Sequence, residues 1–384
     1  MTTAPLQALP LDQLRRRRSV KWRAFPEDVL PLFVAETDYP LAPAVQQALA
    51  DAVALGDTGY TPDDPGIRGA YVGFATRRYG WTPDPTGIHT TGDVMMGVVE
   101  ILRRVTNPGD RVVITPPVYP PFSICIPEAG AVVEPVPLLE SDAGFALDLD
   151  GIEAAFAGGA RAILLCNPHN PTGTVHPRAI LARLAELAQA YGAVVVSDEI
   201  HAPLAPPEAG FTPFLSASEA AATVGYAVTS ASKAFNLAGL KCALMVTADP
   251  GTTATVRAMP PEVFWRTGLF GALAGAAAFS PDSDPWLDAA QAAIAANHAL
   301  LATLLAEHLP AARFRIPQAG YLAWVDLSDL GWGENPAARI LRDAKVALQQ
   351  GPDFGYGGTG HVRINVGCSP EVLTEAVRRI GALV

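Results

Sequence analysis

Three short apolar runs, each followed by a polar loop, constrain the fold of this chain more than any other feature. They are Arg111–Thr115, Ala162–Cys166 and Ala193–Ser197, and all are rich in Val, Ile or Leu. Between the second and the third, Pro177–Tyr191 repeats leucine at helical spacing and is followed by Gly192. A strand, a helix and a further strand in this order predict parallel strands that are covered by helices.

The flanking regions predict a second structural unit. Two further strands are expected in the same sheet, at Tyr226–Thr229 and Ala243–Thr247, and a helix near the N-terminus at Pro43–Leu55. Near the C-terminus we expect a helix at Trp286–Leu309, a strand at Tyr321–Leu327 and a final helix from Pro370. We therefore predict an α/β fold with a large, mostly parallel-sheet domain (51–284) covered by helices. A smaller α/β domain is expected from residues 1–50 and 285–384.

Composition narrows the class of partner. The 384 residues are 49% hydrophobic and 17% charged, which excludes intrinsic disorder. The net charge of −11 argues against a nucleic-acid partner and favours small molecules. The longest apolar runs are too short or too rich in glycine to span a bilayer. Four dispersed cysteines predict buried free thiols, no metal site and a cytoplasmic location. The run Arg15–Arg18 is expected to be a solvated helix end or a subunit contact.

The segment Ser230–Lys241 contains the most unusual lysine of the sequence. Lys233 lies just past an expected strand end, between small and hydroxyl residues. Partial burial and the neighbouring charge of Lys241 would lower the pKa of Lys233 and free its amine as a nucleophile. The hydroxyls of Ser230 and Ser232 could hold an anion beside it. On this segment alone, an ordinary exposed lysine remains the more frequent case.

Two other loops point to the same place. Asp198 ends one expected strand, and the string Asn167–Gly173 follows the neighbouring one. Because the carboxyl ends of parallel strands meet at one edge of a sheet, these groups and Lys233 should converge in one crevice.

Here the chain resembles a known family. It is similar to the fold-type I pyridoxal 5′-phosphate (PLP) enzymes of the aminotransferase class I/II superfamily, and most of all to the cystathionine β-lyase (C–S lyase) group typified by MalY and PatB. The resemblance runs through motifs in the same order along nearly the whole chain: Val34–Pro40, Gly59–Pro62, Pro116–Phe122, Asn167–Gly173, Ser197–His201, Ser232–Leu240 and Val362–Asn365.

The resemblance implies a role for each matching residue around the PLP ring. Lys233 matches the lysine that binds the cofactor aldehyde covalently. Asp198 matches the acid beside the pyridine nitrogen, whose charge keeps the ring protonated. Asn170 and His201 match the positions beside the ring 3′-oxygen, and Tyr119 matches the aromatic residue that stacks on the ring. The resemblance makes Lys233, Asp198 and Tyr119 the expected catalytic residues.

The cofactor phosphate is expected at the start of a helix near Val94, where free amides and the helix dipole attract anions. The residues implied around it are Asp93, Val94, Ser230, Ser232, Lys241 and, from a neighbouring subunit, Tyr60. A contribution from a neighbouring subunit implies a homodimer with its active site at the interface.

The substrate is expected to be an amino acid. Arg363 matches the arginine that binds the substrate α-carboxylate, which a guanidinium can do with two parallel hydrogen bonds. Glu36 and Asp38 are expected near the substrate entrance. The chain departs from the usual pattern at Lys241, where aminotransferases usually have arginine, and at Asp93, which would either face the phosphate or cap the helix.

The implied activity is that of a carbon–sulfur β-lyase, which acts on cystathionine or an S-substituted cysteine and releases a thiol, pyruvate and ammonia. An aminotransferase is the alternative, because both reactions use the same residues up to the loss of the α-proton. A non-catalytic ligand-binding or regulatory protein on this fold would lack the lysine, the acid or the arginine, and all three are present.

Overall fold

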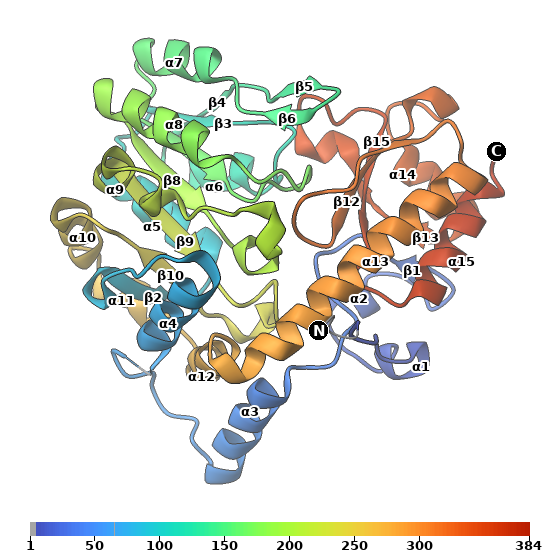
Figure 1. The fold of residues 1–384 in the computed structure, drawn as a ribbon, viewed down its shortest axis with the longest axis horizontal. Coiled ribbons are helices and arrows are strands. Elements are labelled where there is room, and N and C mark those ends of the chain that lie inside the picture. Colours follow the sequence, from blue (N-terminus) through green and yellow to red (C-terminus); the bar gives the residue numbers. More distant parts are fainter. Residues whose placement is uncertain (1–4, 65) are drawn as a thin grey trace.

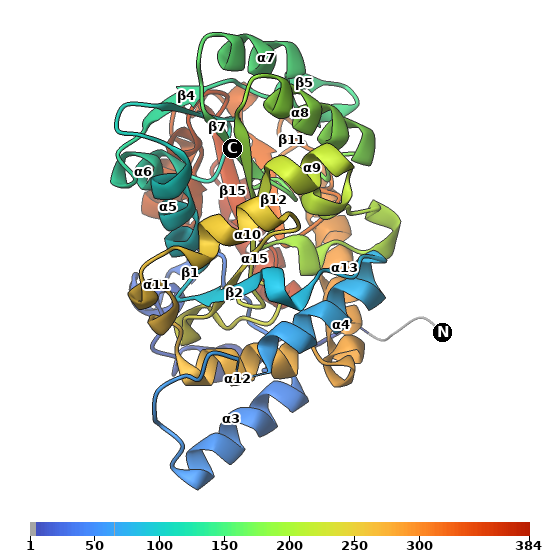
Figure 2. The ribbon, with the colours of Figure 1, turned by 90° about the vertical axis from the view of Figure 1, so that its left-hand side faces the viewer.

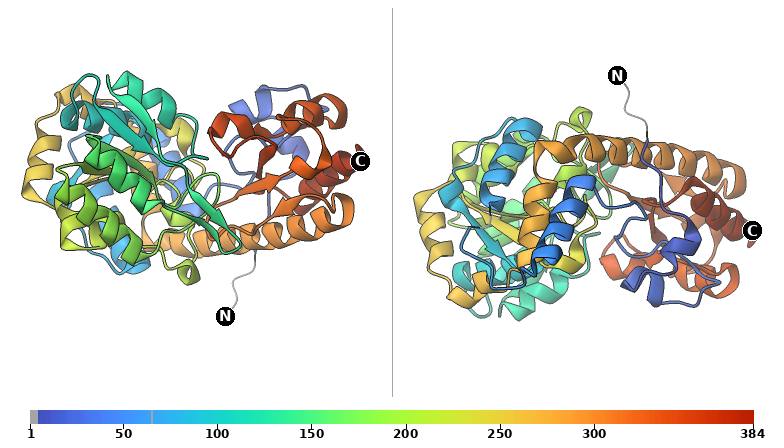
Figure 3. Two further views of the ribbon diagram at one scale, coloured as in Figure 1. Left: turned by 90° about the horizontal axis from the view of Figure 1, so that it is seen from above. Right: turned by 90° about the horizontal axis from the view of Figure 1, so that it is seen from below.

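The computed structural model describes residues 5–64 and 66–384. Figure 1 shows two lobes, a larger one around a seven-stranded sheet and a smaller one around a four-stranded sheet. Helix α13 (Asp284–His308) begins beside the larger lobe and continues along the smaller one, as the two views in Figure 3 show. Both α2 (Val20–Arg23) and α15 (Pro370–Gly381) lie in the smaller lobe, so the two ends of the chain build it together.

The large sheet brings the carboxyl ends of its parallel strands to one edge. Its strands, in order across the sheet, are β2 (Ile88–Thr91), β10 (Ala243–Val246), β9 (Gly225–Thr229), β8 (Val194–Asp198), β7 (Ala162–Cys166), β3 (Arg111–Ile114) and β4 (Val132–Pro135). The strands from β9 to β4 pair in parallel. Strand β10 is antiparallel to both β9 and β2, so β2 points the same way as β9. Loops after β2, β3, β7, β8 and β9 therefore leave the sheet at the same edge.

Helices cover both faces of this sheet. Figure 2 shows α5 and α6 on one side and α8 and α9 on the other. The helices of the larger lobe are α4 (Ile67–Tyr79), α5 (Val94–Val105), α6 (Phe122–Glu128), α7 (Leu149–Ala157), α8 (Arg178–Ala190), α9 (Glu219–Val224), α10 (Pro250–Arg257), α11 (Pro261–Trp265) and α12 (Leu269–Ala278).

Burial of both sheet faces explains why the strands are apolar throughout instead of alternating. In β7, Leu164 and Cys166 pack into a cluster with residues of α5 and α6, such as Ile101. Ile163 and Leu165 point the other way, into the main hydrophobic cluster with residues of α7 and α8. Successive side chains of a strand alternate between faces, so one apolar run supplies two cores.

The smaller lobe is antiparallel. Its sheet has the order β11 (Arg313–Phe314), β12 (Leu322–Asp326), β15 (His361–Asn365) and β14 (Gln349–Gln350). The N-terminal segment joins this lobe because β1 (Leu30–Pro31) pairs in parallel with β13 (Val346–Ala347). Helices α1 (Leu11–Leu14) and α14 (Pro336–Arg339) also lie in the smaller lobe, whereas α3 (Pro43–Leu55) packs against α12 of the larger lobe. Strands β5 (Leu139–Ser141) and β6 (Gly144–Ala146) form a separate hairpin.

Local chemistry sets the ends of the helices that matter for the site. Helix α5 begins after Asp93, whose carboxylate accepts the Met96 amide at 2.9 Å as an N-cap. Helix α3 has Pro43 at its first position and ends at Gly56, which adopts φ 66°. Each of these signals is local in the sequence.

The predicted α/β fold is confirmed, including the mostly parallel sheet. The expected strands and helices are all present within a few residues of their expected bounds. The structure adds β2 and β4 at the edges of the large sheet. The domain limits at residues 50 and 285 stay predictions; helix α3, which crosses the first limit, packs against α12.

By length and composition, residues Pro281–His308 could cross a membrane, and 44% of their most apolar stretch is buried inside the fold. Helix α13 packs along α15, and its side chains Leu287, Ala290 and Leu301 are buried in the main hydrophobic cluster. We therefore interpret it as a core helix that joins the two lobes.

Candidate active site

A cavity of about 500 Å³ lies at the edge where the parallel strands of the large sheet end. The loops after β2, β3, β7, β8 and β9 each contribute to it, and the smaller lobe closes it from the other side through its strands β14 and β15. The residues expected at the site that line this cavity are Asp93, Val94, Tyr119, Asn170, Asp198, His201, Ser232, Lys233, Lys241 and Arg363. The convergence that the sequence predicted is therefore present.

Lys233 presents its amine to this cavity. Its Nζ donates a hydrogen bond to the carbonyl oxygen of Ala35 at 3.3 Å. Burial, reinforced by the charge of Arg363, lowers the pKa of Lys233 to about 8. A larger fraction of this amine is consequently unprotonated near neutral pH than of an exposed lysine, whose pKa is about 10.4.

Asp198 lies buried at the end of β8, where it faces the cavity. Its Oδ1 accepts a hydrogen bond from the Ile200 amide at 3.0 Å. Burial raises the pKa of Asp198 to about 7, although this hydrogen bond and the charge of Lys233 both act to lower it. A buried carboxyl group of this kind is best stabilised by a cation placed against it.

Arg363 and Asn170 meet where the two lobes face each other. Arg363 Nη1 donates to Asn170 Oδ1 at 3.0 Å, and Nη2 donates to the Phe33 carbonyl oxygen at 3.1 Å. Within the described part of the chain, the buried Nε of Arg363 has no hydrogen-bond partner. Burial lowers the pKa of Arg363 to about 10, so the group stays cationic at neutral pH. A buried guanidinium with spare donors is suited to an anionic ligand.

Two aromatic groups complete the wall around Lys233. His201 is buried, and burial together with the charges of Lys233 and Arg363 lowers its pKa to about 3. It is therefore a neutral imidazole at physiological pH. Tyr119, whose pKa is raised mainly by burial, lines the cavity as a neutral phenol.

The opposite end of the cavity is more exposed. Asp93 caps α5 through Oδ1, and its Oδ2 forms an ion pair with Lys241 Nζ at 3.0 Å. Of the two placements expected for Asp93, the structure shows the cap. The carboxylate is nevertheless not turned away, because its second oxygen remains at the cavity wall beside Lys241.

Four residues expected at the site do not line the cavity of this chain. Ser230 Oγ is committed to the backbone, because it donates to the Cys242 carbonyl at 2.7 Å and accepts the Ser232 amide at 3.1 Å. Asp38 is buried in an ion pair with Lys21 at 2.8 Å, which corrects its expected place at the entrance. The remaining two are Glu36, whose charge still acts on the pKa of Lys233, and Tyr60, which is fully exposed.

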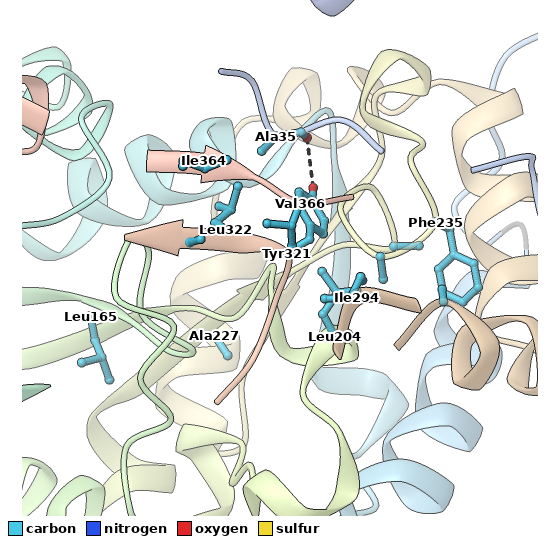
Figure 4. Close-up of a cluster of buried hydrophobic side chains, with 14 of the residues drawn as sticks. Ala35, Leu165, Leu204, Ala227, Phe235, Ile294, Tyr321, Leu322, Ile364 and Val366 are labelled. Atoms are coloured by element: carbon cyan, nitrogen blue, oxygen red, sulfur yellow. Dashed lines mark hydrogen bonds between the residues drawn. The ribbon is translucent and has the colours of Figure 1, made fainter. Parts of the chain in front are cut away.

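Sequence reasoning missed the contacts that hold the segment Phe33–Tyr39, which we call the strap. Its carbonyl groups accept hydrogen bonds from side chains of distant elements. Figure 4 shows the bond from Tyr321 to Ala35, 3.0 Å long. The other side-chain donors are Arg17, Lys21, Asn236, Asn365 and, as described above, Lys233 and Arg363.

Part of this strap network had a sequence signal and part had none. Asn236 and Asn365 belong to motifs that the sequence singles out, and Asn236 bonds Thr37 through both its amide atoms. Arg17 was expected at a solvated helix end or a subunit contact; instead it donates to the carbonyls of Thr37 and Tyr39. No pattern in the sequence distinguishes Lys21.

Comparison with known proteins assigns the family. Residues 27–380 match the family described as aminotransferase class I and II. This chain belongs to that family. A protein of Mycobacterium leprae (strain TN) is 44% identical to it, over 99% of this chain and 98% of its own length. The cystathionine beta-lyase of Corynebacterium glutamicum is 36% identical, over 97% and 98%. A PLP-dependent protein from Corynebacterium diphtheriae has a similar structure, with TM-score 0.93, 34% identity and 98% of both chains covered.

The family is PLP-dependent, and the cavity fits that cofactor. Lys233 offers the aldehyde an amine with a lowered pKa. The buried carboxyl group of Asp198 would be stabilised by a cation such as a protonated pyridine nitrogen. The start of α5, with Ser232 and Lys241 in the same wall, offers amides, a hydroxyl and an ammonium group to a phosphate. Among the described residues of this wall, Asp93 is the group that opposes an anion.

Proposed function

We propose that this protein is a PLP-dependent carbon–sulfur β-lyase that acts on cystathionine or another S-substituted cysteine. The placement of Lys233, Asp198 and Arg363 in one cavity supports PLP chemistry on an amino acid, which a lyase and an aminotransferase share. The observation that favours the lyase is the alignment of this chain, over nearly its whole length, with the cystathionine beta-lyase of Corynebacterium glutamicum. The overall reaction would be RS–CH2–CH(NH3⁺)–COO⁻ + H2O → RSH + pyruvate + NH4⁺.

In this proposal each residue has a defined task. Arg363 binds the substrate α-carboxylate and fixes its orientation, because its fork is rigid and its charge is buried. When bound, PLP supplies an electron sink for the pair left on the α-carbon. Lys233 Nζ takes the α-proton, which its lowered pKa permits near neutral pH. Asp198 would stabilise positive charge on the ring nitrogen of the bound cofactor. Asn170 and the neutral His201 would hold the ring oxygen, and Tyr119 would stack on the ring.

Product stoichiometry separates the lyase from an aminotransferase. The protein would be mixed with S-methyl-L-cysteine without any keto acid, and pyruvate would be followed over many turnovers. Continued release of pyruvate and methanethiol in equal amounts is the expected result. Product that stops at one equivalent of enzyme, with the cofactor left as its amine, would instead assign an aminotransferase.

The lysine assignment has its own test. Lys233→Ala should remove the visible absorbance of the bound cofactor and lower turnover by about 10³-fold or more. The matched control is Lys345→Asn, which changes an exposed lysine at φ 55°, a conformation that asparagine tolerates. Normal absorbance and turnover in Lys233→Ala would refute the assignment.

We also propose that the active protein is a homodimer in which Tyr60 of one chain reaches the phosphate end of the other. Tyr60 and Trp265 are large exposed side chains, and Thr61 Oγ1 bonds the Thr267 carbonyl at 2.7 Å, which joins their two segments. Exposed aromatic groups gathered in one place favour an interface. Sedimentation of the wild type and of Trp265→Asp would test this, with a dimer expected only for the wild type.

A cytoplasmic location completes the proposal. Among the described residues all four cysteines are free, and burial raises their pKa values. Unreactive free thiols are typical of proteins in a reducing compartment.

A further inference from the structure

Arg363 is a buried cation whose hydrogen-bond partners carry no charge. Both acceptors that its guanidinium contacts in the described chain are neutral, namely the amide oxygen of Asn170 and the carbonyl oxygen of Phe33. A buried charge is costly unless its surroundings compensate it, so any further group in contact with this guanidinium matters.

The aromatic ring of Phe354 is such a group. The guanidinium carbon Cζ of Arg363 lies over this ring, 5.2 Å from its centroid. The face of an aromatic ring attracts a cation, and the attraction is stronger where water is excluded, as it is between these two buried residues. The ring therefore stabilises the cation without neutralising it, which leaves the charge available to an anionic ligand.

The Phe354 ring is itself held in place by a row of aromatic side chains. Trp324 packs against it at 64°, with 5.0 Å between the ring centroids. Trp324 lies directly opposite Arg363 in the pairing of β12 with β15, so both side chains are on the same face of the smaller sheet. His361 stacks on the other end of the row, 4.9 Å from Trp324. The ring thus has a fixed position beneath the guanidinium.

The backbone of Phe354 connects this row to the larger lobe. Its carbonyl oxygen accepts a hydrogen bond from the Val118 amide at 3.0 Å, and Val118 precedes Tyr119 in the loop that follows β3. The residues that line the cavity include Tyr119 and Arg363 but not Phe354. The ring can therefore influence a ligand in the cavity only through Arg363.

We propose that Phe354 is a positioning residue for substrate binding. Its ring holds the Arg363 guanidinium in the orientation that binds the substrate α-carboxylate, and it supports the positive charge there without a competing anion. The inference rests on the task proposed for Arg363. It applies to a lyase and to an aminotransferase alike, because both bind the same carboxylate.

Two ligands that differ only in the carboxylate test this inference. S-methyl-L-cysteine has the carboxylate, and S-methyl-L-cysteinamide has a neutral amide in its place. Each is mixed with PLP-loaded protein in a stopped-flow instrument, and the first change in cofactor absorbance is followed against ligand concentration. The dissociation constants obtained in this way do not depend on whether a thiol is released later.

The wild type should bind the acid more tightly than the amide. In Phe354→Leu this preference should fall about tenfold, through weaker binding of the acid alone. Phe354→Met, which fills the space without a ring, should show the same fall and replaces the leucine variant if that one does not fold. The matched control is Phe279→Leu, which removes a buried ring in the larger lobe that packs against Tyr71 and Phe74 and should leave the preference unchanged.

An unchanged preference in the folded Phe354 variants would overturn the inference. A wild type that binds the acid and the amide equally would also overturn it, because Arg363 would then not bind the carboxylate. The β-lyase function is tested separately by methanethiol release from the acid. Protein that shows the expected preference but releases no methanethiol would refute that function and leave the inference intact.

Discussion

Two lysine–aspartate ion pairs of nearly equal length border the site, and they differ in burial. Lys21 and Asp38 are 2.8 Å apart with side chains at most 1% exposed, whereas Lys241 and Asp93 are 3.0 Å apart with side chains 61% and 38% exposed. The first pair holds the strap, since Lys21 Nζ also donates to the Glu36 carbonyl. The second lies beside the expected phosphate. The same chemical pair therefore holds the fold together where it is buried, and it can separate at little cost where water reaches both side chains.

Removing the cation from each pair is the strongest test of the difference between them. Lys21→Met leaves the Asp38 carboxylate buried and unpaired, which should lower the free energy of unfolding by about 3–5 kcal/mol. Lys241→Met, the matched control, should change it by no more than about 1 kcal/mol, because Asp93 stays hydrated. Urea unfolding at pH 7 would measure both. Equal losses would show that burial does not separate the pairs.

The loss in Lys21→Met should also depend on pH. Burial already raises the pKa of Asp38, and Lys21 acts to lower it, so the substitution raises that pKa further. Folded protein then holds a proton at pH values where the unfolded chain, with a pKa near 3.9, has released it. Stability of the variant relative to wild type is therefore regained as pH falls towards 4. A pH-independent difference would contradict this account.

Arg363 extends the comparison to a buried cation that faces the cavity. Arg363→Lys keeps the charge but loses the fork, so kcat/KM should fall about 100-fold, or about 2.7 kcal/mol. The cofactor absorbance should remain, because the arginine is assigned to substrate and not to PLP. Loss of absorbance together with activity would mean that Arg363 instead supports the cofactor site.

The pKa of Lys233 can be measured without turnover. Because only the neutral amine attacks an aldehyde, the rate at which PLP attaches to cofactor-free protein should rise about tenfold per pH unit below 8 and level off above it. Stopped-flow absorbance would record the rate, with Nα-acetyl-lysine as the control for ionisation of PLP. A rise that continues to pH 10 would indicate an unperturbed lysine.

The smallest effect is expected at the exposed pair. Asp93→Asn keeps the helix cap but removes a negative charge beside the phosphate, so PLP should bind about three- to fivefold more tightly. The difference should shrink at high salt, because exposed charges are screened. Titration of cofactor-free protein would measure the dissociation constant. Weaker binding in the variant would show that Asp93 helps to hold the cofactor through Lys241.

Much of the fold and the site could be predicted from the sequence because the signals are local. Apolar runs such as Ala162–Cys166 predict the strands. The residues that follow each run then predict which side chains lie at the shared edge of the sheet. This is how Asp198, Asn170 and Lys233 could be placed together. The roles assigned to these residues, and to His201 and Tyr119, stay predictions that the experiments above test.

Asp38 and Ser230 could not be placed correctly because their partners are not local. Asp38 lies in a motif near the start, and only folding brings Lys21 against it. Ser230 was expected to face an anion, yet its hydroxyl is satisfied by the carbonyl of Cys242, twelve residues away. A polar side chain takes the partner that burial leaves available.

By itself the sequence determined the alternation of strands and helices and the loops at the carboxyl ends of the strands. It also determined that the motifs on these loops follow one another in the order that is typical of the family. Only the tertiary structure decided which polar groups face the cavity and which are used to hold the strap and the loops. The reason is physical: an element forms from contacts within a few residues, whereas the burial of a charge and the identity of its counterion depend on segments that are far apart in the chain.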